Sequence, residues 1–320
     1  MKLISVGDNV VDCYEDQGMY YPGGNCVNVA VYCKRYGFKE CAYIGVFGTD
    51  EKAEHIKWAL KQEGVTFERS RHMVGISGQP RVRLTPDGDR VFVHSPKNTV
   101  QHLVRLRLTQ EDLDYIAGFD LCHTSCYSGI EPELPALAEH CRVSFDFSTR
   151  TELDYLERVC PYVNIAFFSG SHLSQEKLNA LITKAHELGT EVVGVTLGGE
   201  GALFSWQGKR YRQGIVPVEV VDTMGAGDSF IAGFLTHFLA TRDMEGALAK
   251  AAEHAAETCK PYAASASPKE FKRNNPKGEG FPAIWIIILE TWPLLHTGGA
   301  REKESVSVRW RPTNQKRKDR

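Results

Sequence analysis

Several features that would place this chain in a special class of proteins are missing from it. No stretch reaches the roughly 18 apolar residues of a membrane span, and the first apolar run is too short for a signal peptide, which needs roughly 7–15. The nine cysteines are an odd number and contain no Cys-x-x-Cys pair, which argues against a disulfide framework. We therefore expect a protein of the reducing cytosol with mostly buried cysteines.

A large excess of charge of either sign is also missing. The net charge is −2 over 320 residues, and 42% of the residues are hydrophobic, as in an ordinary soluble globular protein. This balance predicts neither a nucleic-acid partner nor a membrane surface as partner. The charge is nevertheless uneven, because residues 261–320 hold 12 Lys and Arg against 6 Asp and Glu. A basic tail therefore follows an acidic body.

Two ligand-binding signatures are absent as well. Gly-x-Gly-x-x-Gly does not follow the first expected strand, which excludes a nicotinamide dehydrogenase built on a Rossmann domain. Cys122, His123 and Cys126 form a metal-like cluster, but the second pair of ligands that a zinc site needs is missing. We expect no zinc there, and we interpret His94, His123 and His172 as ordinary polar residues without a specific partner.

The chain does contain a regular alternation of short apolar segments and amphipathic helical segments. The expected strands cover residues 3–6, 41–46, 121–124, 143–147, 165–168, 192–196, 202–206 and 215–221. The expected helices cover residues 26–36, 51–63, 175–188 and 229–239. Alternation of this kind predicts an α/β fold with a parallel sheet that is covered on both faces.

Two segments interrupt this alternation. Residues 81–85 and 90–93 flank Pro86-Asp87-Gly88-Asp89, which predicts a hairpin with Asp-Gly in its turn. Residues 13–21 form a second short irregular or extended piece. Isolated strands in an α/β protein often build a small lid over the active site. The alternative is a surface hairpin without a function.

The most informative stretch is Asp222-Thr223-Met224-Gly225-Ala226-Gly227-Asp228, which opens the expected helix 229–239. Backbone N–H groups and the dipole at a helix N-terminus favour an anion there, and glycines let it approach the backbone closely. A bound phosphate would repel the carboxylate of Asp228, so that residue needs another reason to be present. General-base catalysis beside a phosphoryl group is such a reason. The alternative is a carboxylate that only complements the helix dipole.

Three further segments fit the same kind of site. Thr196-Leu197-Gly198-Gly199-Glu200-Gly201 is a glycine-rich strand end, where open α/β sheets bind nucleotides. Gly23 and Gly24 open a helix whose first turns carry Asn28, an amide that can bind a polyol. Asp12 lies near the carboxyl end of the first strand, where a carboxylate can accept hydrogen bonds from sugar hydroxyls. Local capping is the alternative role for Asp12 and Asn28.

These four motifs together resemble the ribokinase/PfkB family of carbohydrate kinases over residues 1 to about 260. Asp222–Asp228 matches the second family signature, and Gly23-Gly24-x-x-x-Asn28 matches the first. Gly7-x-x-x-x-Asp12 matches the N-terminal substrate motif, and Thr196-Leu197-Gly198-x-x-Gly201 matches the nucleotide loop. The resemblance implies a ribokinase-like three-layer αβα fold with a mostly parallel central sheet. It also implies a small β lid from about residues 13–21 and 79–95.

The resemblance also implies a role for each matching residue. Asp228 takes the proton from the attacking hydroxyl, and the N–H groups of Gly225, Ala226 and Gly227 form the anion hole. Asp12, Gly23, Gly24 and Asn28 hold the sugar, and Thr196, Gly198 and Gly201 line the nucleotide. Asp222 lies where members that use a monovalent cation such as K⁺ bind it. ATP and Mg²⁺ are the implied cofactors, and a homodimer through the lid is the implied assembly.

Within the family, the stretches that look most like the fructoselysine 6-kinases are residues 7–12, 24–32, 35–37, 89–92 and 222–235. That likeness implies transfer of the γ-phosphate of ATP to the 6-hydroxyl of fructoselysine or a related fructosamine. Two alternatives stay open at this point. One is a kinase for another ketose or a nucleoside, and the other is a catalytically weak sugar- or nucleotide-binding sensor on the same fold.

Two departures from the family pattern stand out. Many members carry an Asn-x-x-Glu motif that organises magnesium-bound water, and the matching stretch here is Ser169-Gly170-Ser171-His172. From Pro261 onward the chain no longer resembles the family. We expect the basic tail, residues 261–320, to be disordered or foreign to the family, for example through an altered reading frame.

Overall fold

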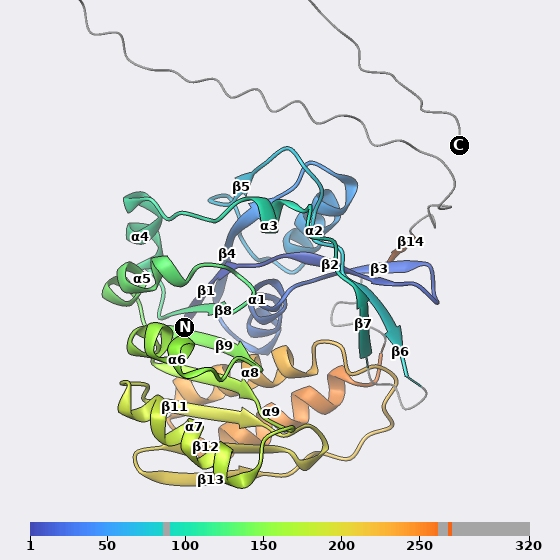
Figure 1. Cartoon of the computed structure of the whole chain (residues 1–320). Coiled ribbons are helices and arrows are strands. Elements are labelled where there is room, and N and C mark those ends of the chain that lie inside the picture. The colour runs from blue at the N-terminus through green and yellow to red at the C-terminus, as the bar shows by residue number, and fades with distance from the viewer. Residues whose placement is uncertain (86–89, 262–267, 271–320) are drawn as a thin grey trace, which may run out of the picture. The chain divides into compact units, whose positions relative to one another are not determined.

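The computed structural model describes residues 1–85, 90–261 and 268–270, which form two β-sheets and the helices around them (Figure 1). The larger sheet has the strand order β13-β12-β11-β10-β9-β8-β1-β4-β5. Its strands are β1 (Lys2–Gly7), β4 (Glu40–Phe47), β5 (Arg71–His72), β8 (Leu121–Ser125), β9 (Val143–Ser148), β10 (Ile165–Ser169), β11 (Val192–Thr196), β12 (Ala202–Trp206) and β13 (Lys209–Gln213). Every neighbouring pair is parallel except β11–β12 and β12–β13.

Helices cover both faces of this sheet, so the predicted three-layer αβα fold is confirmed. One face packs against α1 (Asn25–Tyr36), α2 (Glu51–Gln62), α8 (Ala226–Thr241) and α9 (Met244–Thr258). The other face packs against α3 (Val100–Leu103), α4 (Gln110–Ile116), α5 (Leu134–His140), α6 (Leu153–Val159) and α7 (Gln175–Glu187). Short 3₁₀ turns are η1 (Glu131–Glu133), η2 (Cys160–Tyr162) and η3 (Gly198–Glu200).

The sequence accounts for this layering in simple terms. In β1, Leu3 faces one apolar core while Ile4 and Val6 face the other, and all three are fully buried. A parallel strand that is buried on both faces needs such a continuous apolar run. Helix α7 begins where the Ser174 side chain accepts a hydrogen bond from the Lys177 N–H, an N-cap worth about 1 kcal/mol.

The smaller sheet has the strand order β14-β3-β2-β6-β7. Its strands are β2 (Val10–Tyr14), β3 (Met19–Gly23), β6 (Arg81–Leu84), β7 (Arg90–His94) and β14 (Lys269–Glu270). The β6–β7 pair is the hairpin expected from the sequence, and β2–β3 is the second extended piece. Only Asp8 and Asn9 separate β1 from β2, so Asp12 lies on a strand of the smaller sheet and not at the end of the first strand.

One expected strand is wrong. Residues 215–221 form no strand, and Ile215 and Val220 are exposed although both are apolar. Pro217 has no N–H to donate to a strand ladder, which weakens any pairing of this segment. Instead, the Val221 N–H donates to the carbonyl of Cys259 at 2.9 Å, which fixes the chain just before the Asp222 turn.

None of the helices in the described ranges is both long enough and apolar enough to cross a membrane. The tail was predicted to be disordered or foreign to the family. Of its residues 261–320, the structure describes only 261 and 268–270. Lys269 and Glu270 pair with Tyr20 and Met19 of β3.

Candidate active site

Helix α8 begins at the glycine-rich turn that the sequence singled out. Gly225 is its N-cap residue and adopts a left-handed φ of 75°, which favours glycine because it has no Cβ. Asp228 then lies in the first turn of the helix. The predicted combination of a helix N-terminus and a carboxylate is therefore present in the structure.

Two asparagines of α1 hold the carboxylate of Asp228. Asn25 donates from Nδ2 to Oδ1 at 2.8 Å, and Asn28 donates from Nδ2 to Oδ2 at 2.7 Å. Both asparagines are buried, and Asp228 is partly buried. One donor on each oxygen fixes the plane of the carboxylate. The structure thus brings together Asn28 and Asp228, which lie 200 residues apart in the sequence.

The three N–H groups expected to bind phosphate differ in their surroundings. Gly227 is exposed, and a Cβ placed on it would meet no atom within 4 Å. The Ala226 N–H donates to the carbonyl of Thr223 at 3.2 Å, so a phosphoryl oxygen would have to share this donor. Gly225 is buried beneath them. Open space above Gly227 is what a bound phosphate requires.

The expected sugar side contains two buried aspartates packed on two glycines. A Cβ on Gly23 would lie 2.2 Å from Asp12 Oδ2, and a Cβ on Gly24 would lie 2.9 Å from Asp8 Oδ2. Glycine at both positions therefore makes room for the carboxylates. Asp8, which the sequence reasoning missed, accepts hydrogen bonds from Ser125 at 3.0 Å and from Ser128 at 3.1 Å.

The expected nucleotide loop lies at the carboxyl end of β11, on the edge of the sheet where parallel α/β folds bind ligands. Thr196 ends that strand and donates from its hydroxyl to the carbonyl of Phe168 at 3.3 Å. Gly198 and Gly201 have left-handed φ values of 59° and 88°. A Cβ on Gly201 would lie 2.0 Å from the carbonyl oxygen of Gln213, so this position requires glycine for packing as well.

Asp222 is fully buried below the turn. Its Oδ1 accepts a hydrogen bond from the Met224 N–H at 2.9 Å, and its Oδ2 accepts one from the Tyr14 hydroxyl at 2.5 Å. Burial, followed by this bond to the carboxylate, raises the pKa of Tyr14 above its ordinary value. Asp222 therefore links strand β2 of the smaller sheet to the turn that precedes α8.

Three residues that the sequence reasoning did not assign belong to the hydrogen-bond network of Asp228: Asn25, Asp146 and His123. Asn25 also donates to Asp146 Oδ2 at 2.9 Å, and it accepts from His123 Nε2 at 2.9 Å. Burial raises the pKa of Asp146 to about 7, and the negative charges of Asp228 and Asp8 add to the rise. The prediction that His123 lacks a specific partner was wrong, because pairing across strands cannot be read from local sequence.

The backbone beside Asp146 marks this place in the structure, although no sequence pattern shows it. Ser148, two residues later, has a left-handed φ of 51°, which is uncommon for a residue with a side chain. Its N–H donates to Asp146 Oδ1 at 2.8 Å. Backbone in such a conformation at a strand end often marks a functional site.

The stretch that replaces Asn-x-x-Glu offers no carboxylate. Ser169 ends β10, and Ser171 and His172 are exposed. Mg²⁺ prefers oxygen ligands, usually one or two carboxylates together with substrate phosphates. Ser169-Gly170-Ser171-His172 therefore does not fit the water-organising role of the family motif.

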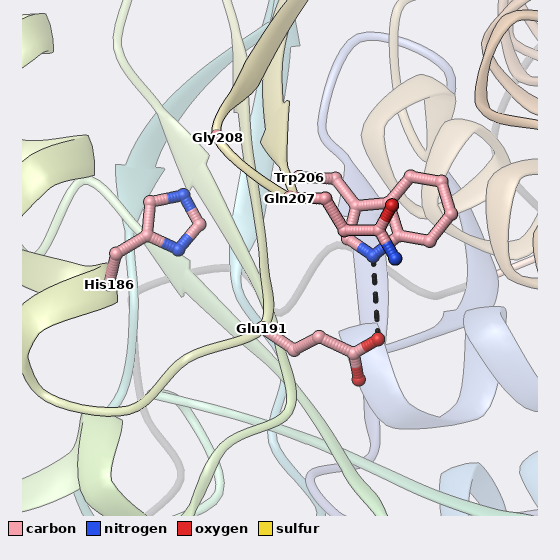
Figure 2. Close-up of a pocket in the computed structure, with 5 residues that line it drawn as sticks. All are labelled: His186, Glu191, Trp206, Gln207 and Gly208. Carbon is pink, nitrogen blue, oxygen red and sulfur yellow. Dashed lines mark hydrogen bonds between the residues drawn. The ribbon is translucent and has the colours of Figure 1, made fainter.

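A separate hollow of about 480 Å³ lies at the other end of β11 (Figure 2). In it, Trp206 Nε1 donates to Glu191 Oε1 at 3.4 Å. His186 lines the same hollow and contacts the carbonyl of Thr190 and the hydroxyl of Ser205, both at 2.8 Å. Glu191 precedes β11 whereas the glycine loop follows it, so this hollow is not part of the site around Asp228.

The fold and the glycine-rich turn with its carboxylate define a class of phosphotransferase, and the comparison with known families agrees. The profile of the pfkB family carbohydrate kinases matches residues 1–270, and the chain belongs to this family. It is a carbohydrate kinase.

Individual relatives show which members of the family the chain resembles. The chain is 51% identical over 264 residues to the fructosamine kinase FrlD of Bacillus subtilis, covering 82% of this chain and 93% of the relative. It is 34% identical over 267 residues to the fructoselysine 6-kinase of Escherichia coli, covering 82% and 98%. Among solved structures, Arabidopsis thaliana ribokinase with ribose and ATP has a TM-score of 0.70 at 21% identity, covering 82% of this chain and 94% of that one. This last likeness concerns the fold.

Proposed function

We propose that this kinase transfers the γ-phosphate of ATP to the 6-hydroxyl of fructoselysine or a related fructosamine, with Asp228 as the general base. The observation that supports it most is the geometry of Asp228. Its carboxylate lies in the first turn of α8, beside the exposed Gly227, and two amides fix its orientation. The proposed base, Asp228, therefore lies next to the N-terminus of α8, where a helix favours an anion.

The chemistry needs little beyond positioning and charge stabilisation. The proton of the sugar hydroxyl passes to Asp228 as the hydroxyl oxygen forms its bond to the γ-phosphorus. The bond from that phosphorus to the bridging oxygen breaks, and ADP leaves. The N–H groups of residues 225–227, with the helix dipole, stabilise the charge on the transferring group.

The acidic character of the site supports a fructosamine as substrate. Asp8, Asp146 and Asp228 are near enough that the charges of the other two raise the pKa of Asp146. Asp12 lies buried on the neighbouring strand β2. A fructosamine carries an amine that is positively charged at neutral pH, and nearby carboxylates favour a cation. The identities to the fructosamine kinase and the fructoselysine 6-kinase point to the same substrate class.

For the nucleotide, we propose that Thr196, Gly198 and Gly201 line the ATP site, because their loop ends β11 at the ligand-binding edge of the sheet. A solved Escherichia coli structure in complex with ATP and Mg²⁺ shares the fold, with a TM-score of 0.69 at 22% identity. Ser169–His172 does not fit the magnesium motif, because it offers no carboxylate to a metal ion. Mg²⁺ would then be held chiefly by the phosphates of ATP.

The edge of the smaller sheet supports a homodimer, which we propose as the assembly. Val91, Phe92 and Val93 of β7 are all exposed, and β7 is the last strand of that sheet among the described residues. An exposed apolar edge strand readily pairs with another strand. Light scattering at several protein concentrations measures the mass. A monomer at micromolar concentration would contradict the proposal.

An ADP-release assay tests the substrate. Fructoselysine and other fructosamines are compared with fructose, ribose and a nucleoside, each with ATP and Mg²⁺. We expect the highest kcat/KM with a fructosamine, and NMR of the product to show phosphate on the 6-oxygen. A higher kcat/KM with another ketose or a nucleoside would replace the proposed substrate. Sugar binding without ADP release would contradict the proposal.

Asp228→Asn tests the base. We expect kcat to fall by at least about 100-fold while ATP binding changes little, because the amide is nearly isosteric but takes no proton. Asp154→Asn, an exposed aspartate at the start of α6, is the matched control and should keep the wild-type kcat. Turnover of Asp228→Asn close to the wild type would refute the assignment.

A further inference from the structure

A buried row of hydrogen bonds leads from the middle of the large sheet to Asp228. The Ser144 hydroxyl contacts His123 Nδ1 at 2.9 Å, and His123 Nε2 contacts Asn25 Oδ1 at 2.9 Å. Asn25 Nδ2 continues to Asp146 and Asp228 at 2.9 and 2.8 Å. Ser144 and His123 are fully buried, on β9 and β8. The family motifs contain neither residue.

Chemistry fixes the direction of every bond in this row. The amide oxygen of Asn25 only accepts, so His123 Nε2 carries the hydrogen of that contact. Burial lowers the pKa of His123 to about 3, so the ring is neutral and Nδ1 accepts from the Ser144 hydroxyl. The two hydrogens of Asn25 Nδ2 then point to the two carboxylates. Each donor meets an acceptor.

The reversed amide would be unfavourable in this place. Turning Asn25 by 180° would set its oxygen against Asp146 Oδ2 and Asp228 Oδ1, two oxygens that repel it when ionised. The same turn would set the amide N–H groups against His123 Nε2–H. The two carboxylates and the Nε2–H of His123 together favour a single orientation of the amide, in which Asn25 donates to Asp228.

We propose that His123 is a positioning residue of the phosphoryl-transfer site: its Nε2–H orients the Asn25 amide, and that amide aims Asp228 at the acceptor hydroxyl. The proposal rests on the proposed function in that Asp228 is taken as the base. Without the Nε2–H donor, Asn28 remains to hold the other oxygen of Asp228. The Asp228 oxygen that Asn25 holds then loses an oriented donor, and the plane of the carboxylate is fixed less firmly.

A merely structural histidine would satisfy its own polar atoms and contribute to stability without acting on turnover. If His123 is a positioning residue, a replacement must keep an N–H donor to preserve kcat. If His123 is only structural, a replacement without a donor should have the same kcat. Gln can place an N–H near the position of Nε2, whereas Met has a similar bulk without a donor. Both variants disturb the packing of a fully buried site, and they differ chiefly in the polar amide of Gln, which supplies that donor.

The experiment compares His123→Gln with His123→Met in kcat, in KM for sugar and ATP, and in Tm. We expect His123→Met to lower kcat by roughly 10- to 100-fold, since a small misplacement of a reacting group has such effects. His123→Gln should recover kcat to within a few-fold of the wild type, and KM for ATP should stay within about twofold in both. Equal kcat values for two variants that fold would overturn the proposal.

Combining the His123 and Asp228 variants tests the positioning role of His123 separately from the role of Asp228 as the base. In the Asp228→Asn background, His123→Met should lower kcat by less than about twofold further, because residues in one network are not additive. A large fall in Asp228→Asn with no loss in His123→Met rejects the positioning role alone. An unchanged Asp228→Asn rejects the base itself.

A further measurement uses only the wild-type protein and therefore does not depend on whether a variant folds. Nitrogen-15 NMR of the wild-type histidine rings reports which ring nitrogen carries the proton. We expect a neutral ring protonated at Nε2 between pH 6 and 8 for His123. A ring protonated at Nδ1 alone, or at both nitrogens, would overturn the proposal, because it contradicts the direction of the row.

Discussion

The hydroxyl of Tyr14 donates a hydrogen bond to Oδ2 of Asp222, and the two residues lie 208 positions apart in the chain. Tyr14 ends strand β2 of the smaller sheet, and Asp222 begins the turn that leads into α8. Both side chains are buried. This bond joins the strand that carries Asp12 to the turn that leads to Asp228, so the two halves of the proposed site are tied together beneath their functional groups.

Tyr14→Phe should destabilise the protein by about 1–3 kcal/mol, because a buried carboxylate oxygen loses a donor while the packing is kept. We expect the KM for sugar to rise as well, since Asp12 lies on the same strand. Tyr21→Phe is the matched control, because the Tyr21 hydroxyl contacts Gln17, which is exposed. Urea denaturation measures the free energy of unfolding of each variant. Equal losses in the two variants would argue against a special role for the Asp222 bond.

Gly227→Ala should separate stability from activity. The position is helical and a Cβ there meets no atom within 4 Å, so alanine should stabilise the helix by roughly 0.5–1 kcal/mol. A phosphoryl group at the helix end would collide with the new methyl group, and kcat/KM for ATP should fall about tenfold or more. Asp154→Asn, at the exposed start of α6, is the control for the kinetics. Unchanged kinetics in Gly227→Ala would place the phosphate elsewhere.

Asp146→Asn should change how stability depends on pH. Burial raises the pKa of Asp146 to about 7 in the folded protein, so between about pH 4 and 7 the folded state binds a proton that the unfolded state does not. The stability contributed by this group is therefore complete below that window and is lost as the pH rises through it. Relative to the wild type, the Tm of the variant should increase between pH 5 and 8. A difference that does not vary with pH would contradict the raised pKa.

Asp12→Asn should weaken sugar binding more than nucleotide binding. A hydrogen bond to a charged group contributes about 1.5–3 kcal/mol, which corresponds to a rise in KM for sugar of roughly 10- to 100-fold. The KM for ATP should stay close to the wild type. Asp16→Asn, at an exposed position just after β2, is the control. A rise in the KM for ATP that equals the rise for sugar would mean that Asp12 acts through the fold.

Much of the fold could be predicted because local patterns encode it. The buried strand at residues 3–6 and the helix at 175–188 follow from apolar periodicity, and the structure has Lys2–Gly7 and Gln175–Glu187. The strand expected at 215–221 was wrong for a related reason. An apolar β-branched run indicates a strand only where a neighbouring strand offers a partner, and Pro217 cannot donate to one.

The residues of the proposed site also fall into two groups, those that the sequence indicated and those that only the structure revealed. Glycines 23, 24, 198, 201, 225 and 227 stand out in the sequence because they cluster at the ends of expected strands and helices, which is a local property. Asn25 and Asp146 did not stand out, although both lie beside Asp228. Their contacts join α1, β9 and α8, and no sequence pattern records a distance across three elements.

The sequence by itself determined the class of this protein: alternating strands and helices, a glycine-rich helix start with Asp228, and membership of the pfkB family. These features depend on backbone conformation and on residues that are close together in the chain. Only the tertiary structure decided that Tyr14 holds Asp222 and that His123 reaches Asp228 through Asn25. Such contacts arise when packing the sheet and helices brings distant polar groups into one buried place, where each must find a partner because water is absent.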